Sequence, residues 1–169
     1  PRIAGDPHLE YAVAAADRFI RTFPNNPNVD YAYYLKGLVH FREDQGLMGY
    51  VYELDLSERE PKGMREAFAA FKELVTKFPD SRYAQDATDR MVYLTNALAR
   101  YEVNVARYYF NRGAYVAAVN RAQAAIVGFP RTAANESALD ILARSYDKLE
   151  LVQLRDELDG CGRVREARA

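Results

Sequence analysis

The pair Phe-Pro occurs three times in this chain, at residues 23–24, 78–79 and 129–130. Twelve residues before each proline stands an alanine: Ala12, Ala67 and Ala118. The residues five and four positions before each proline are also apolar. Because the residue before a proline is forced out of helical conformation, each pair predicts the end of a helix. Three unrelated amphipathic helices would not need aligned alanines, so the pattern indicates an internal repeat.

The stretch 105–130 shows most clearly what the repeat is. Gly113 ends one apolar helical pattern, and a second stripe of small residues follows it up to Pro130. These spacings are typical of a tetratricopeptide repeat (TPR), a helical pair of about 34 residues. Its signature positions fall on Ala106, Tyr109, Gly113, Ala118, Ala125 and Pro130, and only the large residue expected at Ala122 is missing. We therefore predict an all-α, TPR-like right-handed superhelix of antiparallel helix pairs.

Helix boundaries follow from prolines, glycines and capping residues. We expect one repeat domain over residues 1–159 and a flexible tail over 160–169. About seven helices are predicted, at 7–22, 28–44, 62–78, 81–111, 114–128, 133–149 and 152–158. The helix at 81–111 is long because no Gly or Pro interrupts its apolar spacing.

A long loop is expected at residues 45–61, because the spacing between Pro24 and Pro79 exceeds one repeat by about 20 residues. The loop carries many apolar side chains. It either folds back over an exposed helix face or lines the concave groove in which repeats bind peptides. Tyr50 and Tyr52 are its candidate groove contacts.

Composition excludes several functional classes. The net charge of −1 gives no electrostatic case for binding nucleic acid or an acidic membrane surface. No known catalytic or nucleotide-binding motif is present, and the two histidines are not at metal-ligand spacing. Glu58 and Glu60 lie in a self-neutralising loop, and the single cysteine, Cys161, lies in a polar tail. We expect no enzyme activity, no cofactor and no metal.

The pair Asn120-Arg121 interrupts an otherwise small and apolar helix. Two interpretations are open. Arg121 either points to solvent, or presents its planar fork to a carboxylate on a partner.

Four segments together resemble the BamD family of TPR lipoproteins, which belong to the outer-membrane β-barrel assembly (BAM) machine. They are AVAAADRFIRTFPNNPNVDYAYYLKGL, LDLSEREP, FPDSRYAQDATDRMVYLTNALARYEVNVARYY and NRGAYVAAVNRAQAAIVGFP. The resemblance covers about residues 9–150 and includes the inserted loop and the long helix as well as the repeat positions.

The resemblance implies a non-enzymatic scaffold that docks on a POTRA domain of BamA and helps to insert β-barrel proteins. It also implies a place at the periplasmic face of the outer membrane, with other BAM lipoproteins and unfolded outer-membrane proteins as partners. The lipid-bearing N-terminal cysteine and the first repeats of the family are expected to lie outside this chain.

The family's POTRA contact maps onto Arg121, and we expect Asn120, Tyr115 and Arg112 to contribute. On this hypothesis Arg121→Glu weakens POTRA binding and leaves the melting temperature nearly unchanged. Two alternatives stay open: a generic TPR adaptor for extended peptides, and an accessory helical domain of a cell-wall enzyme.

Overall fold

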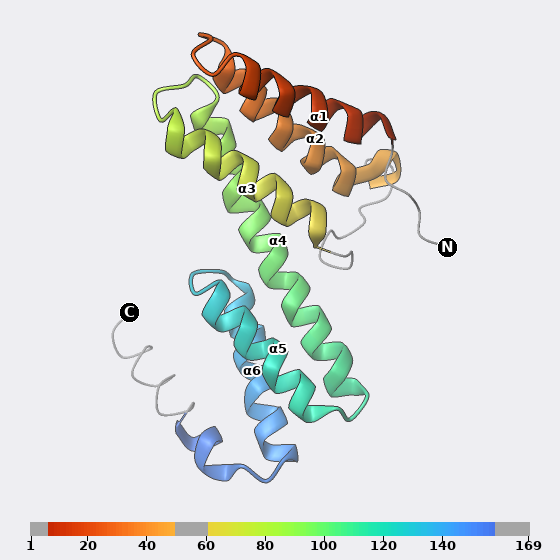
Figure 1. Cartoon of the computed structure of the whole chain (residues 1–169). Coiled ribbons are helices and arrows are strands. Elements are labelled where there is room, and N and C mark those ends of the chain that lie inside the picture. The colour runs from red at the N-terminus through yellow and green to blue at the C-terminus, as the bar shows by residue number, and fades with distance from the viewer. Residues whose placement is uncertain (1–6, 50–60, 158–169) are drawn as a thin grey trace. The chain divides into compact units, whose positions relative to one another are not determined.

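The computed structural model describes residues 7–49 and 61–157, and every regular element in these ranges is a helix (Figure 1). The helices are α1 (Pro7–Thr22), α2 (Val29–Gly49), α3 (Lys62–Lys77), α4 (Ala84–Asn111), α5 (Tyr115–Gly128) and α6 (Ala134–Lys148). A short seventh helix spans 152–157. Neighbouring helices pack in pairs, α1 with α2, α2 with α3, and α5 with α6. The predicted all-α, TPR-like fold is confirmed.

Two helix ends differ by more than one residue from the sequence-based prediction. Helix α2 continues to Gly49, so the first residues of the expected 45–61 loop are helical. Helix α4 begins at Ala84 instead of residue 81, because Ser81 is held in a turn. Its hydroxyl donates to Asp30 at 2.6 Å and accepts the Tyr83 amide at 3.2 Å. The roles suggested for Tyr50, Tyr52 and the tail at 160–169 fall outside the described residues.

The chain divides into two compact units, residues 1–97 (unit 1) and 98–169 (unit 2), and α4 contributes to both. The expected single repeat domain over 1–159 stays a prediction.

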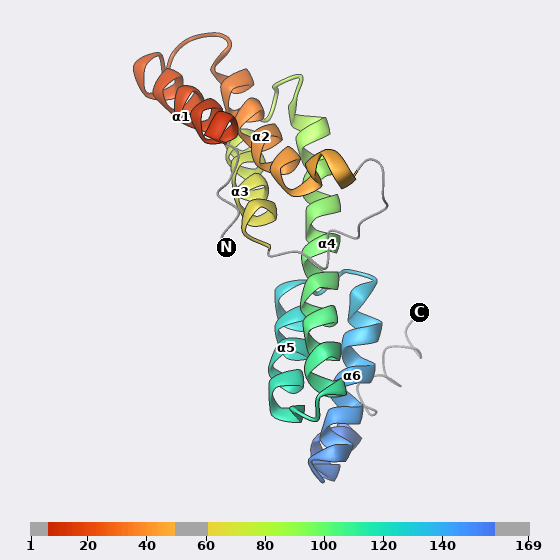
Figure 2. The same ribbon diagram turned by 90° about the vertical axis from the view of Figure 1, so that its right-hand side faces the viewer.

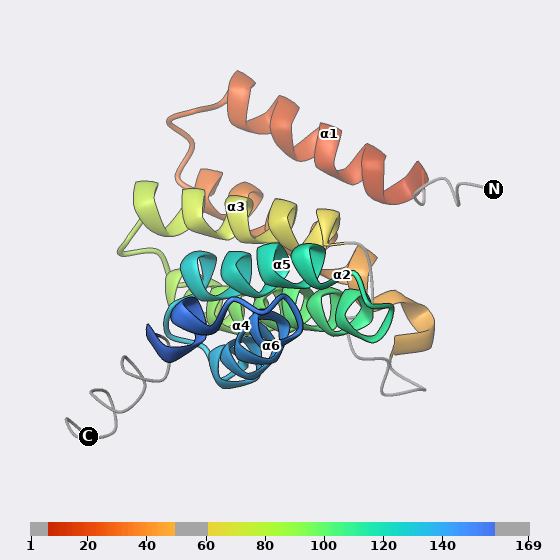
Figure 3. The same ribbon diagram turned by 90° about the horizontal axis from the view of Figure 1, so that it is seen from below.

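Unit 1 is built around the aromatic ring of Phe71 on α3. Phe71, Met64, Leu74 and Leu94 are its largest fully buried apolar side chains. Helix α2 can approach this ring closely because residue 37 is a glycine. A Cβ added at Gly37 would lie 2.6 Å from Phe71 Cδ1. Helix α1 lies at the edge of this unit when the molecule is viewed from below (Figure 3).

A polar cluster joins α2 to the first half of α4. Tyr34 donates its hydroxyl to Asp86 at 2.6 Å, and Arg90 Nε donates to the same oxygen at 2.6 Å. The hydrogen bond from Arg90 lowers the pKa of Asp86, and burial, followed by the bond to Asp86, raises the pKa of Tyr34. The Arg90 guanidinium also lies over the ring of Phe41, 5.0 Å from its centroid. The carboxylate is therefore satisfied within the unit.

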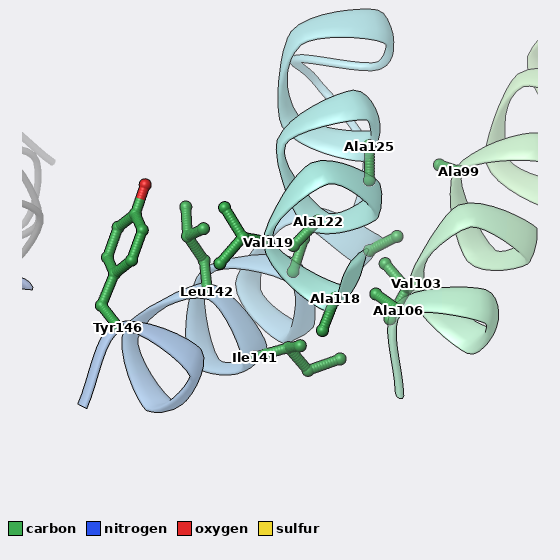
Figure 4. Close-up of a cluster of buried hydrophobic side chains, with 12 residues drawn as sticks. Ala99, Val103, Ala106, Ala118, Val119, Ala122, Ala125, Ile141, Leu142 and Tyr146 are labelled. Carbon is green, nitrogen blue, oxygen red and sulfur yellow. The ribbon is translucent and has the colours of Figure 1, made fainter. Parts of the chain in front are cut away.

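Unit 2 is packed through small residues (Figure 4). On α5, Ala118, Ala122 and Ala125 are completely buried. They belong to one buried cluster with side chains from α4 and α6: Ala99, Val103, Ala106, Ile141, Leu142 and Tyr146. The repeat pattern expects a large residue at position 122, and this packing explains why an alanine stands there. Ala122 is enclosed on all sides, and its small side chain allows the neighbouring helices to come into close contact.

The turn that brings α5 back against α4 depends on Gly113. Its φ of 76° lies in the left-handed region that glycine adopts without strain. In this conformation the Ala114 amide donates to the Tyr109 carbonyl at 3.0 Å, which closes the end of α4. The second half of α4 then lies beside both α5 and α6 (Figure 2).

We predict that Gly37→Ala lowers the free energy of unfolding by about 1–3 kcal/mol, because the new methyl group would overlap the buried Phe71 ring. Gly128→Ala is the matched control. A Cβ there meets nothing within 4 Å, so the higher helix propensity of alanine should raise stability by up to about 1 kcal/mol. Urea unfolding of both variants measures the difference. Equal effects would contradict the packing described for Phe71.

Candidate partner-binding site

Helix α5 presents an exposed face on the side away from its buried alanines. Four of its members recur at intervals of three or four residues and share one side of the helix, and the fifth, Arg121, lies at the edge of that side. We define this α5 outer face as Val116, Asn120, Arg121, Ala124 and Val127, all of which are exposed. The two valines stand out, with 62% and 80% of their surface accessible. The face therefore combines apolar groups with one cation.

Arg121 is held by an acid inside its own unit. Its Nη1 donates to Glu102 Oε2 on α4 at 3.0 Å. The Glu102 side chain is only 7% exposed, whereas that of Arg121 is 45% exposed. Neither sequence-based interpretation foresaw this pairing: the arginine is partly solvated, and it already contacts a carboxylate of the same chain.

The pairing leaves part of the arginine available. A guanidinium carries five N–H donors in a rigid plane. Glu102 is the one acceptor that Arg121 binds among the residues that the structure describes. The remaining edge of the fork can therefore meet a second acceptor, and the buried carboxylate fixes its orientation.

The other predicted site residues lie elsewhere on the α4–α5 hairpin. Tyr115 packs edge-on against Phe110 with ring centroids 5.5 Å apart, and the Arg112 guanidinium lies 4.9 Å from the centroid of Tyr108. Both contacts are next to the turn at Gly113. Arg121 follows Tyr115 by about 9 Å along the helix axis. Of the predicted set, the structure places only Asn120 and Arg121 side by side, on the α5 outer face.

Sequence reasoning missed Glu102 and the two valines. A signal for Glu102 was present, because it falls between Leu98 and Ala106 at helical spacing, inside the apolar stripe of α4. A charge in such a stripe predicts a buried, paired acid.

The described residues show neither a metal site nor a helix suited to crossing a membrane. They contain no group of three or more His, Cys, Asp or Glu side chains that could hold a metal ion. Searched over the same ranges, no helix combines the length and the apolar character that crossing a membrane requires. His40, on α2, has its Nδ1 3.3 Å from Glu66 Oε2 on α3 and is mostly buried, in line with a packing role.

The internal ion pair changes the expectation for Arg121 variants. We predict that Arg121→Ala lowers the free energy of unfolding by about 1–3 kcal/mol, because the buried Glu102 loses a charged hydrogen-bond donor. Arg121→Glu should cost more, because it places two carboxylates together. The earlier expectation of a nearly unchanged melting temperature is therefore withdrawn.

Urea unfolding checks this prediction. The double variant Glu102→Gln/Arg121→Gln should recover most of the loss, because a neutral pair can still share a hydrogen bond. Arg131→Ala, at an exposed arginine that makes no ion pair with a described residue, is the control. If Arg121→Ala and Arg131→Ala have the same stability, the ion pair contributes nothing and the account of Arg121 is wrong.

Comparison with known proteins places the chain in a family. The family model YfiO, described as "Outer membrane lipoprotein", matches residues 5–159. A relative from Neisseria meningitidis serogroup B, named outer membrane protein assembly factor BamD, is 51% identical over 149 residues, covering 88% of this chain and 56% of the relative.

Proteins of the same name from Xylella fastidiosa and Vibrio cholerae are 40% and 36% identical over 145 and 143 residues. The matches cover 86% and 85% of this chain, and 50% and 59% of the relatives. The chain thus spans about half the length of the relatives it matches. The resemblance noted in the sequence is confirmed: the chain belongs to the YfiO family of outer membrane lipoproteins, whose matched members are named BamD.

Proposed function

We propose that this chain is a non-enzymatic scaffold in the assembly of outer-membrane proteins, and that it docks on a POTRA domain of BamA. The names of the relatives support the general role, since each is called an outer membrane protein assembly factor. On this proposal the full-length protein is lipid-anchored at the periplasmic face of the outer membrane. Other BAM lipoproteins and unfolded outer-membrane proteins are its further proposed partners.

The observation that carries the docking proposal is the α5 outer face. Arg121 lies on it in a fixed orientation, because a buried carboxylate holds one edge of its guanidinium. Fixing a side chain before binding reduces the entropy lost on association. Arginine is also among the residues that most often dominate binding energy in protein interfaces.

The neighbours of Arg121 on this face suit the same role. Val116 and Val127 are large apolar groups left in water, and burying them against a partner is favourable by about 25 cal/mol per Å². Both valines lie within about 9 Å of Arg121 along the helix axis, so one partner surface can cover all three side chains. A partner with an acidic side chain next to an apolar patch would match this arrangement.

A generic peptide adaptor is the second candidate, because a groove of about 450 Å³ opens between α4 and α6 in unit 2. The two functions use different residues, so variants of α5 separate them.

We predict that Glu102→Gln/Arg121→Gln weakens binding to a purified BamA POTRA domain by about 10-fold or more, because the charge-assisted contact to the partner is lost while the internal pair is retained in neutral form. Glu102→Gln alone should bind within about 2-fold of the parent chain, since the arginine remains. Isothermal titration calorimetry measures both.

The apolar part of the face is tested by Val116→Ser/Val127→Ser, with Lys72→Ser on the exposed side of α3 as the control. Both valines are exposed, so the substitutions should leave stability unchanged while binding weakens several-fold. Unchanged affinity in the α5 variants would show that the POTRA domain docks elsewhere or not at all.

A further inference from the structure

An arrangement of one phenylalanine, one arginine and one aspartate occurs in both units. In unit 1, Arg90 of α4 lies over Phe41 of α2 and binds Asp86, which precedes it by one helical turn. In unit 2, Arg144 of α6 lies over Phe110 of α4, with its guanidinium carbon 4.6 Å from the ring centroid. Arg144 also binds Asp140, again four residues before it, at 3.3 Å.

The two arrangements differ in whether the aspartate has a second hydrogen-bond donor. In unit 1 the hydroxyl of Tyr34, seven residues before Phe41, donates to Asp86 at 2.6 Å. Seven residues before Phe110 stands Val103, which has no hydroxyl and lies in the apolar core. Asp140 has Arg144 as its one hydrogen-bond donor within 7–49 and 61–157.

A second aromatic ring is also replaced in unit 2. The ring of Tyr34 stacks on Tyr83 with centroids 4.8 Å apart and an interplanar angle of 15°. Tyr83 stands three residues before Asp86, and the residue three before Asp140 is Ser137. Unit 2 therefore lacks both rings that fill this region of unit 1.

A groove opens beside one of these two positions: Ser137, the counterpart of Tyr83, lines it, whereas Val103 does not. It is lined by Arg107, Phe110 and Asn111 from α4, and by Glu136, Ser137, Asp140, Ile141 and Arg144 from α6. The two helices lie side by side in Figure 2. The volume of about 450 Å³ is within the range of sites that hold small ligands or single large side chains.

We propose that this groove binds a tyrosine side chain presented by a partner polypeptide. The phenol donates its O–H to the Asp140 carboxylate, as Tyr34 does to Asp86 in unit 1. Its ring lies in the groove beside Ser137, the position that corresponds to Tyr83 of unit 1, next to Phe110 and the stacked Arg144.

The charges of the groove favour a neutral donor over a charged ligand. Arg107 and Arg144 are balanced by Glu136 and Asp140, so neither a carboxylate nor an ammonium gains a net attraction. A phenol matches instead through its hydrogen-bond donor and its aromatic face, to which an arginine is attracted. Phenylalanine would fill the same space and leave the carboxylate without the additional donor.

This inference is independent of docking through α5. The groove is formed by α4 and α6, whereas the POTRA proposal uses exposed residues of α5. Either proposal can fail while the other holds, because the test below contains no POTRA domain.

The experiment is a titration of the ¹⁵N-labelled 169-residue chain with the capped peptide Gly-Gly-Tyr-Gly-Gly, followed by NMR. We expect saturable shifts of the Asn111 side-chain amide, the Arg144 Nε–H and the backbone amides around Ser137, with a dissociation constant on the order of 1 mM. The Phe analogue of the peptide should bind about 5-fold more weakly, because it lacks the hydroxyl.

Asp140→Ala should abolish the preference for tyrosine over phenylalanine without unfolding the chain, because the Asp140 side chain is 63% exposed. Asp147→Ala is the matched control: this carboxylate is on the same helix, binds Arg155 at 2.8 Å and does not line the groove. Absence of saturable shifts, shifts located elsewhere, or equal binding of both peptides to the parent chain would each overturn the proposal.

Discussion

The close contact of α5 with α4 and α6 is the constraint on which unit 2 depends. It is possible because three of the four buried residues of α5 are alanines with no exposed surface, Ala118, Ala122 and Ala125. Small side chains bring helix backbones near each other, and tight packing then transmits the position of one helix to the next. The packing of the buried face of α5 therefore also fixes the position of its exposed face. In unit 1 a glycine, Gly37, has the same role where α2 passes the ring of Phe71.

Charged groups are placed around these packed surfaces in a consistent way. Glu102 is buried and is neutralised by Arg121, which reaches it from the more exposed α5. Asp86 is partly buried and takes hydrogen bonds from Arg90 and Tyr34, and these bonds lower its pKa. Each acid is paired with an arginine: Arg121 covers Glu102 from the solvent side, and Arg90, which is less exposed than Asp86, lies over the ring of Phe41. Burying a carboxylate is costly without such a donor, so Glu102 also specifies that α5 must lie beside α4.

Features that depend on local backbone chemistry could be predicted from the sequence. The Phe-Pro pairs and Gly113 restrict φ and ψ directly, and the helix ends near them fall within one residue of the prediction at Thr22, Lys77 and Gly128. The end of α2 was misplaced, because no proline or left-handed glycine stops a helix before Gly49. The start of α4 was misplaced because Ser81 binds Asp30, a residue 51 positions away.

The candidate site was also predictable only in part, because its geometry depends on contacts between residues that are far apart in the sequence. Arg121 was identified from an unusual polar pair on a small-residue helix, but its partner Glu102 belongs to another helix, and the distance between them depends on tertiary packing. The groove in unit 2 could not be foreseen, since its lining comes from two helices, α4 and α6, that are separated in the sequence by α5. Comparing corresponding positions requires knowing which helices lie together, and sequence spacing does not supply this.

The central claim is that small residues on α5 set the distance between helices in unit 2, and it is tested most directly by enlarging one of them. The measurement is the free energy of unfolding of Ala122→Leu compared with Ala124→Leu, an exposed position on the same helix. The account predicts a loss of about 1–3 kcal/mol for the buried position and almost none for the exposed one. If Ala122→Leu were as stable as Ala124→Leu, the helices would have room to spare, and the claim would be contradicted.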